Sequence, residues 1–294
     1  MPLFNVYIPK DLDDALEFLN KHVPEAYPIA GGTDILIQIR EEKIKPKWLV
    51  DLSGLNELNY VKRENGQVRI GALVRVGDLE NTLLFKEKKY SGFVDVFKKF
   101  ANAHVRNLAT IGGNIAVALS SSDFITLFKI LDAKIKLESV KGSRWISIHD
   151  LIVDKRTLAK EPDEVITEIA FNDIPENSIT AFLKFDYREI IITGIVTVAA
   201  YLKLKDNVIE DVRIAFDRVS RRIPDRVVKT EEYLKGKEFN METLRTAYEE
   251  ILPKEMVRKS DFRASAEYRL HLSKVLMKRA LTLCKERLGG GESL

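Results

Sequence analysis

Two glycine pairs, each preceded by a short apolar run, most constrain how this chain can fold. The first is Gly31-Gly32 in AGGTD, which follows AYPIA, and the second is Gly112-Gly113 in TIGGN. Glycine permits close approach of the main chain and positive φ, so that several backbone N–H groups can point at one anion. A single pair of this kind is more often an ordinary tight turn. Two pairs flanked by Thr, Asn and Asp favour a ligand site, and a diphosphate is a group that such loops bind.

The spacing of the glycines disfavours the common nucleotide-binding motifs. Neither loop has the G-x-G-x-x-G pattern of a dinucleotide fold or the G-x-x-x-x-G-K-[ST] pattern of a P-loop. Thr33 or Asp34 is expected to cap a helix over DILIQIREE, whose first N–H groups would add to the anion cradle. The sequence therefore predicts a phosphate-binding site of another type than the NAD and ATP modules.

Composition limits the other possibilities. The chain has 294 residues, 45% of them hydrophobic, which is enough for two or three compact units. Its formal net charge of +3 indicates no dedicated nucleic-acid or membrane surface. The single cysteine, Cys284, cannot supply the ligands of an iron–sulfur cluster or a structural zinc site, so any such cluster must lie in another protein. Because no signal peptide or long apolar run occurs, we expect a cytoplasmic protein.

Short strands and helices alternate in the first part of the chain, and three long β-prone runs followed by helices make up the second. The polar segment NDIPENS predicts a domain boundary near residue 175. We expect one domain over 1–175, with subdomains at about 1–58 and 59–175, a second over 176–288, and a flexible tail over 289–294.

The expected elements of the first domain are a strand at FNVYI, a helix capped by Asp11, strands at AYPIA and WLVDLSGL, a hairpin turning at Asn65-Gly66, helices at SGFVDVFKKFANA and FITLFKILDA, and strands at KIKLES and EVITEIAF. Those of the second domain are three antiparallel strands at AFLKFDYREI, GIVTVAAYLKL and EDVRIAFDRV, and a final helix from about Ala264 to Leu288.

The segment HVRNLATIGGNIAVALSSSDF, together with AGGTD, closely resembles the FAD-binding medium subunit of the molybdenum hydroxylases, the carbon monoxide dehydrogenase, xanthine dehydrogenase and aldehyde oxidoreductase family. Further similar stretches, such as KPKWLVDLSGLNELNYV, GALVRVGDLE and DFRASAEYRLHLSKVLMKRAL, follow in the family's order. The resemblance therefore covers nearly the whole chain. It implies an α+β fold, in which a two-subdomain PCMH-type FAD-binding domain precedes a C-terminal domain with a three-stranded antiparallel sheet and a helical bundle.

The resemblance also implies which residues bind FAD. Phe100 and Ile166 would pack on the flavin, Asp123 would bond a cofactor hydroxyl, and Lys184 would approach from the C-terminal domain. It implies no catalytic residue and no metal ligand in this chain. The pyrophosphate and the adjoining ribityl chain would be held from two sides by Pro28, Ile29, Ala30, Gly31, Gly32, Thr33, Asp34 and Ile35 and by Thr110, Ile111, Gly112, Gly113 and Asn114.

The implied assembly is a heteromeric oxidoreductase in which this chain is one subunit. A large molybdopterin subunit would oxidise the substrate, and a small subunit with two [2Fe-2S] clusters would relay electrons to the FAD of this chain, in a dimer of heterotrimers. The FAD would then reduce an external acceptor. Three positions depart from the family pattern: His104 replaces a frequent glutamine, Ser120 a proline, and Ile192, four residues after Arg188, an acid.

Two other functions are compatible with the sequence. One is a self-contained FAD-dependent reductase or oxidase of the same broad fold, such as the enolpyruvyl-sugar reductase type, which would need an acid or base over the flavin ring. The other is a scaffold subunit without FAD, which the intact AGGTD and TIGGN motifs disfavour. His104 is interpreted as a structural or surface residue, and Cys284 as a buried thiol without a redox role.

Overall fold

The computed structural model describes residues 3–120, 122–186, 194–219 and 224–289. The chain forms two compact units that do not follow its order. Unit 1 comprises Met1–Leu79, Asn102–Ala118 and Ala133–Asn172, and unit 2 comprises Glu80–Ala101, Leu119–Asp132 and Asp173–Leu294. Two segments that precede residue 173 therefore belong with the C-terminal half of the chain. Arg188 and Ile192, and the expected tail beyond Gly289, lie outside the described residues.

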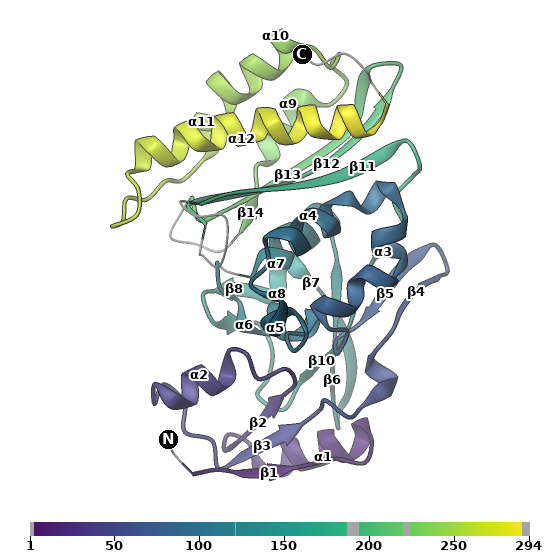
Figure 1. Cartoon of the computed structure of the whole chain (residues 1–294), viewed down its shortest axis with the longest axis vertical. Helices are drawn as coiled ribbons and strands as arrows, with labels where there is room; N and C mark the ends of the chain where they lie inside the picture. The colour runs from purple at the N-terminus through teal and green to yellow at the C-terminus, as the bar shows by residue number, and fades with distance from the viewer. Residues whose placement is uncertain (1–2, 121, 187–193, 220–223, 290–294) are drawn as a thin grey trace. The chain divides into compact units, whose positions relative to one another are not determined.

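Unit 1 begins with a small parallel sheet of order β1-β3-β2 (Figure 1). Its strands are β1 (Asn5–Tyr7), β2 (Ala26–Ile29) and β3 (Trp48–Asp51). Helix α1 (Leu12–His22) is capped as predicted, because Asp11 accepts a hydrogen bond from the Asp14 N–H. Its buried residues Ala15, Leu16 and Leu19 form one core with strand residues such as Val50. This core supports the strand that leads into the first glycine pair.

The second sheet of unit 1 is antiparallel, with the order β4-β5-β10-β6-β7. The predicted hairpin is confirmed: Asn65 and Gly66 have φ values of 50° and 72°, as a type I′ turn requires. Central strand β10 is buried over all but its last residue, and its one buried acid, Glu168, forms an ion pair with Arg69 of β5. The strands are β4 (Val61–Glu64), β5 (Gln67–Gly71), β6 (Lys134–Ser139), β7 (Gly142–Ser147) and β10 (Val165–Asn172).

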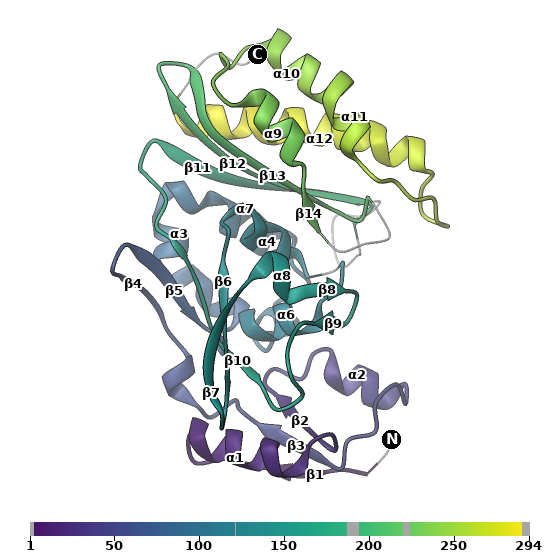
Figure 2. The same ribbon diagram turned by 180° about the vertical axis from the view of Figure 1, so that it is seen from behind.

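Short elements connect these sheets and carry the residues of interest. Strands β8 and β9 form a hairpin that the sequence pattern did not predict (Figure 2). The elements are η1 (Asn56–Leu58), η2 (Val76–Asn81), α2 (Ile35–Arg40), α5 (Ala103–Arg106), α6 (Ile111–Val117), α8 (Ile148–Leu151), β8 (Ile152–Asp154) and β9 (Thr157–Leu158).

Unit 2 is built on an antiparallel sheet of order β11-β12-β13-β14. The three predicted long strands are present, and the two-residue β14 adds a short edge. Between β12 and β13 the chain turns at Asp206-Asn207, with φ values of 49° and 62°. The strands are β11 (Ser178–Phe185), β12 (Val196–Lys205), β13 (Val208–Asp217) and β14 (Asp225–Arg226).

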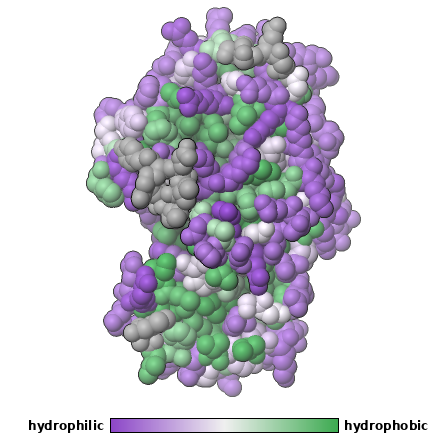
Figure 3. Space-filling model, viewed as in Figure 1, coloured by the Kyte–Doolittle hydropathy of each residue, from purple (hydrophilic) through white to green (hydrophobic). Residues whose placement is uncertain are grey.

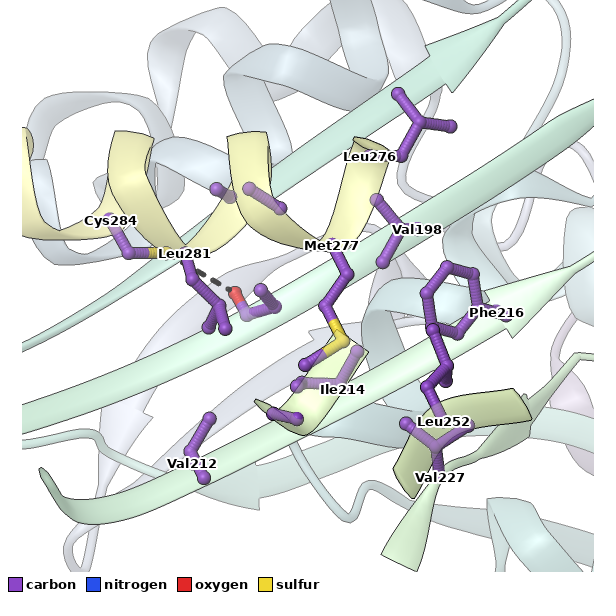
Figure 4. Close-up of a cluster of buried hydrophobic side chains, with 14 of the residues drawn as sticks. Val198, Val212, Ile214, Phe216, Val227, Leu252, Leu276, Met277, Leu281 and Cys284 are labelled. Atoms are coloured by element: carbon purple, nitrogen blue, oxygen red, sulfur yellow. Dashed lines mark hydrogen bonds between the residues drawn. The ribbon is translucent and has the colours of Figure 1, made fainter. Parts of the chain in front are cut away.

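Helices cover both faces of this sheet, with α12 across one face and α4 and α7 against the other (Figures 1 and 2). Figure 4 shows α12 placing Leu276, Met277, Leu281 and Cys284 over apolar strand residues such as Val198. This burial is the main stabilising contribution to the layer. The helices are α3 (Leu83–Lys86), η3 (Lys88–Tyr90), α4 (Ser91–Lys99), α7 (Asp123–Ile130), α9 (Val228–Leu234), α10 (Met241–Thr246), the π-helical η4 (Ala247–Ile251), α11 (Leu252–Glu255) and α12 (Ala266–Arg287).

The surface of unit 1 has an apolar area over β1, β2, β3 and α2 (Figure 3). Val6 and Ile8 are 53% and 74% exposed, and Leu36 and Ile37 of α2 also reach the surface. Over the ranges that the structure describes, every helix is too short or too polar to cross a membrane.

Candidate functional site

The main chain of Gly31 lies directly against the segment that precedes the second glycine pair. A Cβ atom on Gly31 would be 1.9 Å from the Leu108 carbonyl oxygen and 3.1 Å from the Ala109 nitrogen, so only glycine fits. Because Leu108 and Ala109 run straight into Thr110, the two loops are neighbours within unit 1. We call residues 28–35 the first glycine loop and residues 110–114 the second glycine loop.

The other glycines of the two loops are also constrained. Gly32 has a φ of +69°, which favours glycine over other residues. A Cβ atom on Gly112 would be 2.6 Å from the Cβ atom of Ala72. Gly113 has more room, since only the Thr110 hydroxyl oxygen would lie near its Cβ atom, at 2.8 Å. The glycines therefore let the backbone of both loops pack more closely than side chains would allow.

The two loops differ in their free hydrogen-bond donors. In the second loop, the N–H groups of residues 111–114 donate to Val74 O, Ala72 O, Thr110 Oγ1 and Thr110 O. In the first loop, no residue that the structure describes accepts a hydrogen bond from the N–H groups of residues 31–34. Consecutive N–H groups without an acceptor in the protein can bind an anion. The first loop thus offers the donors, and the second packs beside it.

Asp34 holds the end of the first loop through its carboxylate. It occupies the N-cap position of α2 but makes no side-chain cap, contrary to the prediction that Thr33 or Asp34 would provide one. Arg156 donates to both Asp34 oxygens, at 2.8 and 3.1 Å, and the Gln38 amide donates to Oδ2 at 2.5 Å. Partial burial opposes ionisation of Asp34, but these hydrogen bonds outweigh it and hold its pKa below the usual value. The Asp34 carboxylate therefore accepts hydrogen bonds from Arg156 and Gln38 and not from the helix backbone.

Polar atoms without partners mark further candidate contacts. Within the described ranges, the buried Oδ1 atoms of Asn114 and Asp123 have no hydrogen-bond partner, and the Ser120 hydroxyl likewise has none. Asp123 begins α7 in unit 2, and its Oδ2 accepts from Lys184 Nζ at 2.8 Å. Because a buried polar atom is normally hydrogen-bonded, each of these oxygens can accept or donate a bond to a ligand.

The remaining predicted residues lie in apolar surroundings. Phe100, in unit 2, is 7% exposed, and its ring is 5.5 Å from that of Phe124. Ile166, on β10 in unit 1, is 8% exposed and pairs with Leu137 of β6. The predicted set thus divides between the units: the two glycine loops and Ile166 belong to unit 1, and Phe100, Asp123 and Lys184 to unit 2. His104 is exposed on α5, as interpreted from the sequence.

Arg156 is the contact of the first loop that the sequence pattern missed. It lies in the turn of the β8–β9 hairpin, 122 residues from Asp34 in the chain. The turn is Lys155-Arg156, without the glycine or asparagine that usually marks a hairpin. No local signal in the sequence pairs this arginine with the AGGTD motif.

Comparison with known proteins matches most of this chain to two protein families. Residues 2–174 match the family described as the FAD binding domain in molybdopterin dehydrogenase, and residues 193–283 match the CO dehydrogenase flavoprotein C-terminal domain. The glyceraldehyde dehydrogenase medium chain of Sulfolobus acidocaldarius is 30% identical, over 95% of this chain and 97% of the relative. The nicotinate dehydrogenase FAD-subunit of Eubacterium barkeri is 31% identical over 82% of each chain.

A solved structure shows the same fold over almost its full length. A chain of the reconstituted CO dehydrogenase from Oligotropha carboxidovorans superposes with a TM-score of 0.91 at 25% identity, covering 98% of this chain and 99% of that chain. The family match extends over more than half of the sequence, and the structural match covers both family regions. The chain therefore belongs to the FAD-binding medium subunits of the molybdenum hydroxylase family.

Proposed function

We propose that this chain binds FAD and acts as the electron-transfer subunit of a molybdenum hydroxylase complex. FAD, when bound, can accept electrons and release them to a second partner. The chain would receive them from the [2Fe-2S] clusters of a partner subunit and deliver them to an external acceptor. Family membership supports this proposal, and so does a loop whose backbone donors have no acceptor in the described part of the chain.

The N–H groups of residues 31–34, which find no acceptor among the residues that the structure describes, are the observation that carries the proposal. A diphosphate can accept several hydrogen bonds from such a row of donors. The absence of a Cβ atom at Gly31 lets the loop lie against Leu108, and Gly32 supplies the positive φ of this backbone path. The residues present therefore fit a dinucleotide cofactor. In the second loop, Thr110 and Gly113 would shape the neighbouring surface, since their polar groups already bond each other.

Side-chain oxygens would hold the less charged parts of the cofactor. Asn114 Oδ1 is a buried acceptor without a partner among the described residues, which suits a hydroxyl or an amino group. From the resemblance, we also propose Asp123, Lys184, Phe100 and Ile166 as FAD contacts. Asp123 Oδ1 is likewise available to a hydroxyl donor. The rest of both glycine loops, Pro28–Ile35 and Thr110–Asn114, completes the proposed set.

The proposed partners are a large molybdopterin subunit and a small iron–sulfur subunit. Relatives with similar sequences are named as medium chains or FAD-binding subunits of dehydrogenases, including a carbon monoxide dehydrogenase medium chain. We propose a dimer of heterotrimers. We further propose an FAD-binding domain over 1–175, with subdomains at about 1–58 and 59–175, and a C-terminal domain over 176–288. The two family regions, 2–174 and 193–283, support a boundary between them.

Purification of the full chain, alone and coexpressed with its genomic neighbours, tests this function. We expect a yellow protein with about one FAD per chain that copurifies with a larger and a smaller subunit. A yellow chain that remains single and turns over a substrate would instead support the self-contained reductase or oxidase. A colourless chain that takes up no added FAD would contradict FAD binding altogether.

A further inference from the structure

We propose that Arg156 is a positioning residue for the diphosphate site, because it ties the two glycine loops together and neutralises the carboxylate of Asp34. The inference rests on the proposed function, since it concerns how the same site accepts an anion. Arg156 itself is not assigned to the FAD contacts. Its role would be exerted through the position and charge of Asp34.

The backbone of Arg156 is fixed to the end of the helix that carries the second glycine loop. The Arg156 N–H donates to the Ala118 carbonyl at 2.9 Å, and Ala118 is the C-cap of α6. Arg156 and Ala118 have φ values of 57° and 45°, in the left-handed region that non-glycine residues seldom adopt. Two such residues joined by a hydrogen bond indicate a contact that the surrounding fold holds in place. Helix α6 starts at Ile111, inside the second loop.

The side chain of Arg156 reaches the first loop. Its two terminal nitrogens donate to the two oxygens of Asp34, at 2.8 and 3.1 Å, which is the bidentate geometry that guanidinium and carboxylate groups favour. Lysine would not reproduce this planar bidentate geometry, because its ammonium is a compact point charge. One residue thus contacts the last part of the first loop by its side chain and the helix of the second loop by its backbone.

The charge of this pair matters for an anionic ligand. Asp34 follows Gly32 by two positions, so its carboxylate belongs to the same loop as the free N–H donors. A diphosphate placed on those donors would be repelled by an unpaired carboxylate. The hydrogen bonds that Arg156 donates to Asp34 raise the pKa of Arg156 and lower the pKa of Asp34, so the two groups stay oppositely charged together. Gln38, which also donates to Asp34, is neutral, and the charge of Lys43 acts on Asp34 more weakly than the hydrogen bonds of Arg156.

Titration of the FAD-free full chain with FAD, followed by fluorescence quenching, tests the proposal. We expect Arg156→Gln to weaken binding by about ten- to a hundredfold, because it leaves the Asp34 carboxylate unpaired beside the bound diphosphate. The matched control is Lys155→Gln, which removes the same charge from the same exposed turn and should change binding by less than about twofold. In the double variant Asp34→Asn/Arg156→Gln, removal of the unpaired carboxylate should restore most of the lost affinity. Added salt should also reduce the defect of Arg156→Gln, because it screens repulsion between charges.

Three outcomes overturn the inference. These are equal binding by Arg156→Gln and Lys155→Gln, a double variant that binds no better than Arg156→Gln, and a defect that salt leaves unchanged. If circular dichroism shows that Arg156→Gln does not fold, Arg156→Lys and the double variant are compared instead. Arg156→Lys should then bind FAD more weakly than the wild-type chain while its melting temperature stays unchanged. Failure of wild-type chain to bind FAD would instead contradict the proposed function, so the two failures are distinct.

Discussion

Lys184 and Asp123 form an ion pair inside unit 2, where Lys184 Nζ donates to Asp123 Oδ2 at 2.8 Å and the side chains are only 5% and 2% exposed. Lys184 lies on β11, cross-strand from Thr197 of β12, and Asp123 is the first residue of α7. Both residues are proposed FAD contacts. The pair shows that each already has a structural partner, so substitutions at either position affect folding as well as binding.

The first prediction concerns the stability of this pair. Lys184→Met should lower the free energy of unfolding by about 3–5 kcal/mol, because it leaves the carboxylate of Asp123 buried without its counter-charge. The double variant Asp123→Asn/Lys184→Met should recover part of this loss. Guanidinium chloride unfolding measures both. As the control, Glu210→Gln breaks the more exposed Lys203–Glu210 pair, at 29% and 32% exposure, and should change stability by about 1 kcal/mol or less. Equal effects of Lys184→Met and Glu210→Gln would contradict the prediction.

The second prediction concerns Asp123 as a ligand-binding group. Asp123→Ala should weaken FAD binding by about 1–3 kcal/mol if its free Oδ1 bonds a buried hydroxyl of the cofactor. Since Lys184 also loses its partner, the comparison is with Asp123→Asn, which loses the same charge but keeps a side-chain oxygen, at a temperature where both variants remain folded. An unchanged affinity in a flavin titration of Asp123→Ala would remove this residue from the proposed site.

The third prediction concerns the contact between the glycine loops. Gly31→Ala should sharply reduce FAD retention, because a methyl group 1.9 Å from the Leu108 carbonyl forces the first loop away from the second. Gly54→Ala is the matched control in unit 1, since apart from its chain neighbours no atom of the described residues lies within 4 Å of the position that its methyl group would occupy. The FAD content of the purified variants measures the effect. Wild-type FAD content in Gly31→Ala would show that the close approach is not needed for binding.

Much of the fold follows from local sequence signals. The Asn65-Gly66 and Asp206-Asn207 turns could be predicted because residues of those types adopt positive φ at small energetic penalty. The capped helix after Asp11 and the long strands of unit 2 likewise reflect short-range preferences and alternation. The glycine loops could be recognised because two rare, similar motifs occur in one chain.

Contacts between distant segments could not be predicted in this way. Asp34 lies in an ordinary helix-capping sequence, but its carboxylate is bound by Arg156, which is 122 residues away in the chain. The turn that presents Arg156 lacks glycine, so the hairpin itself carries no local signal. The grouping of 80–101 and 119–132 with the C-terminal part of the chain is also a long-range property. It depends on apolar faces that meet only in three dimensions.

The fourth prediction concerns the pH dependence of stability. Asp217 is fully buried, and burial raises its pKa to about 7 despite the adjacent Arg218. Its Oδ2 lies 3.8 Å from Arg218 Nε and makes no hydrogen bond to the described residues. The folded state therefore binds the carboxyl proton of Asp217 more tightly than the unfolded state does. The stability that protonated Asp217 contributes is full below pH 3.8 and is lost as the pH rises through its raised pKa of about 7.

Thermal unfolding between pH 5 and pH 8 measures how much Asp217 contributes to stability, because this range includes its raised pKa of about 7. We expect the wild-type melting temperature to fall over this range more than that of Asp217→Asn, which cannot ionise. The two proteins should differ least at the acidic end, where Asp217 is protonated in the folded state, and this comparison serves as the internal control. Parallel profiles for the two proteins would contradict the prediction.

The fifth prediction uses Cys284 as a reporter of unit 2. Cys284 lies on the buried face of α12, with 0% exposure and its Sγ 3.9 Å from the Ala200 carbonyl oxygen (Figure 4). Burial raises the pKa of the thiol, so it has neither the access nor the thiolate character that reaction requires. A disulfide reagent should therefore leave the native protein unmodified and label it only as denaturant opens the contact between α12 and the sheet.

The labelling rate should rise with denaturant in step with unfolding measured by circular dichroism, because the thiol is reached only when α12 leaves the strands. As the positive control, Ser143→Cys in a Cys284→Ser background places the sole thiol on an exposed position of β7 and should react at once in native buffer. Fast labelling of the wild-type chain in native buffer would mean that α12 separates from β12 without global unfolding. That outcome would contradict the tight packing on which the stability of unit 2 depends.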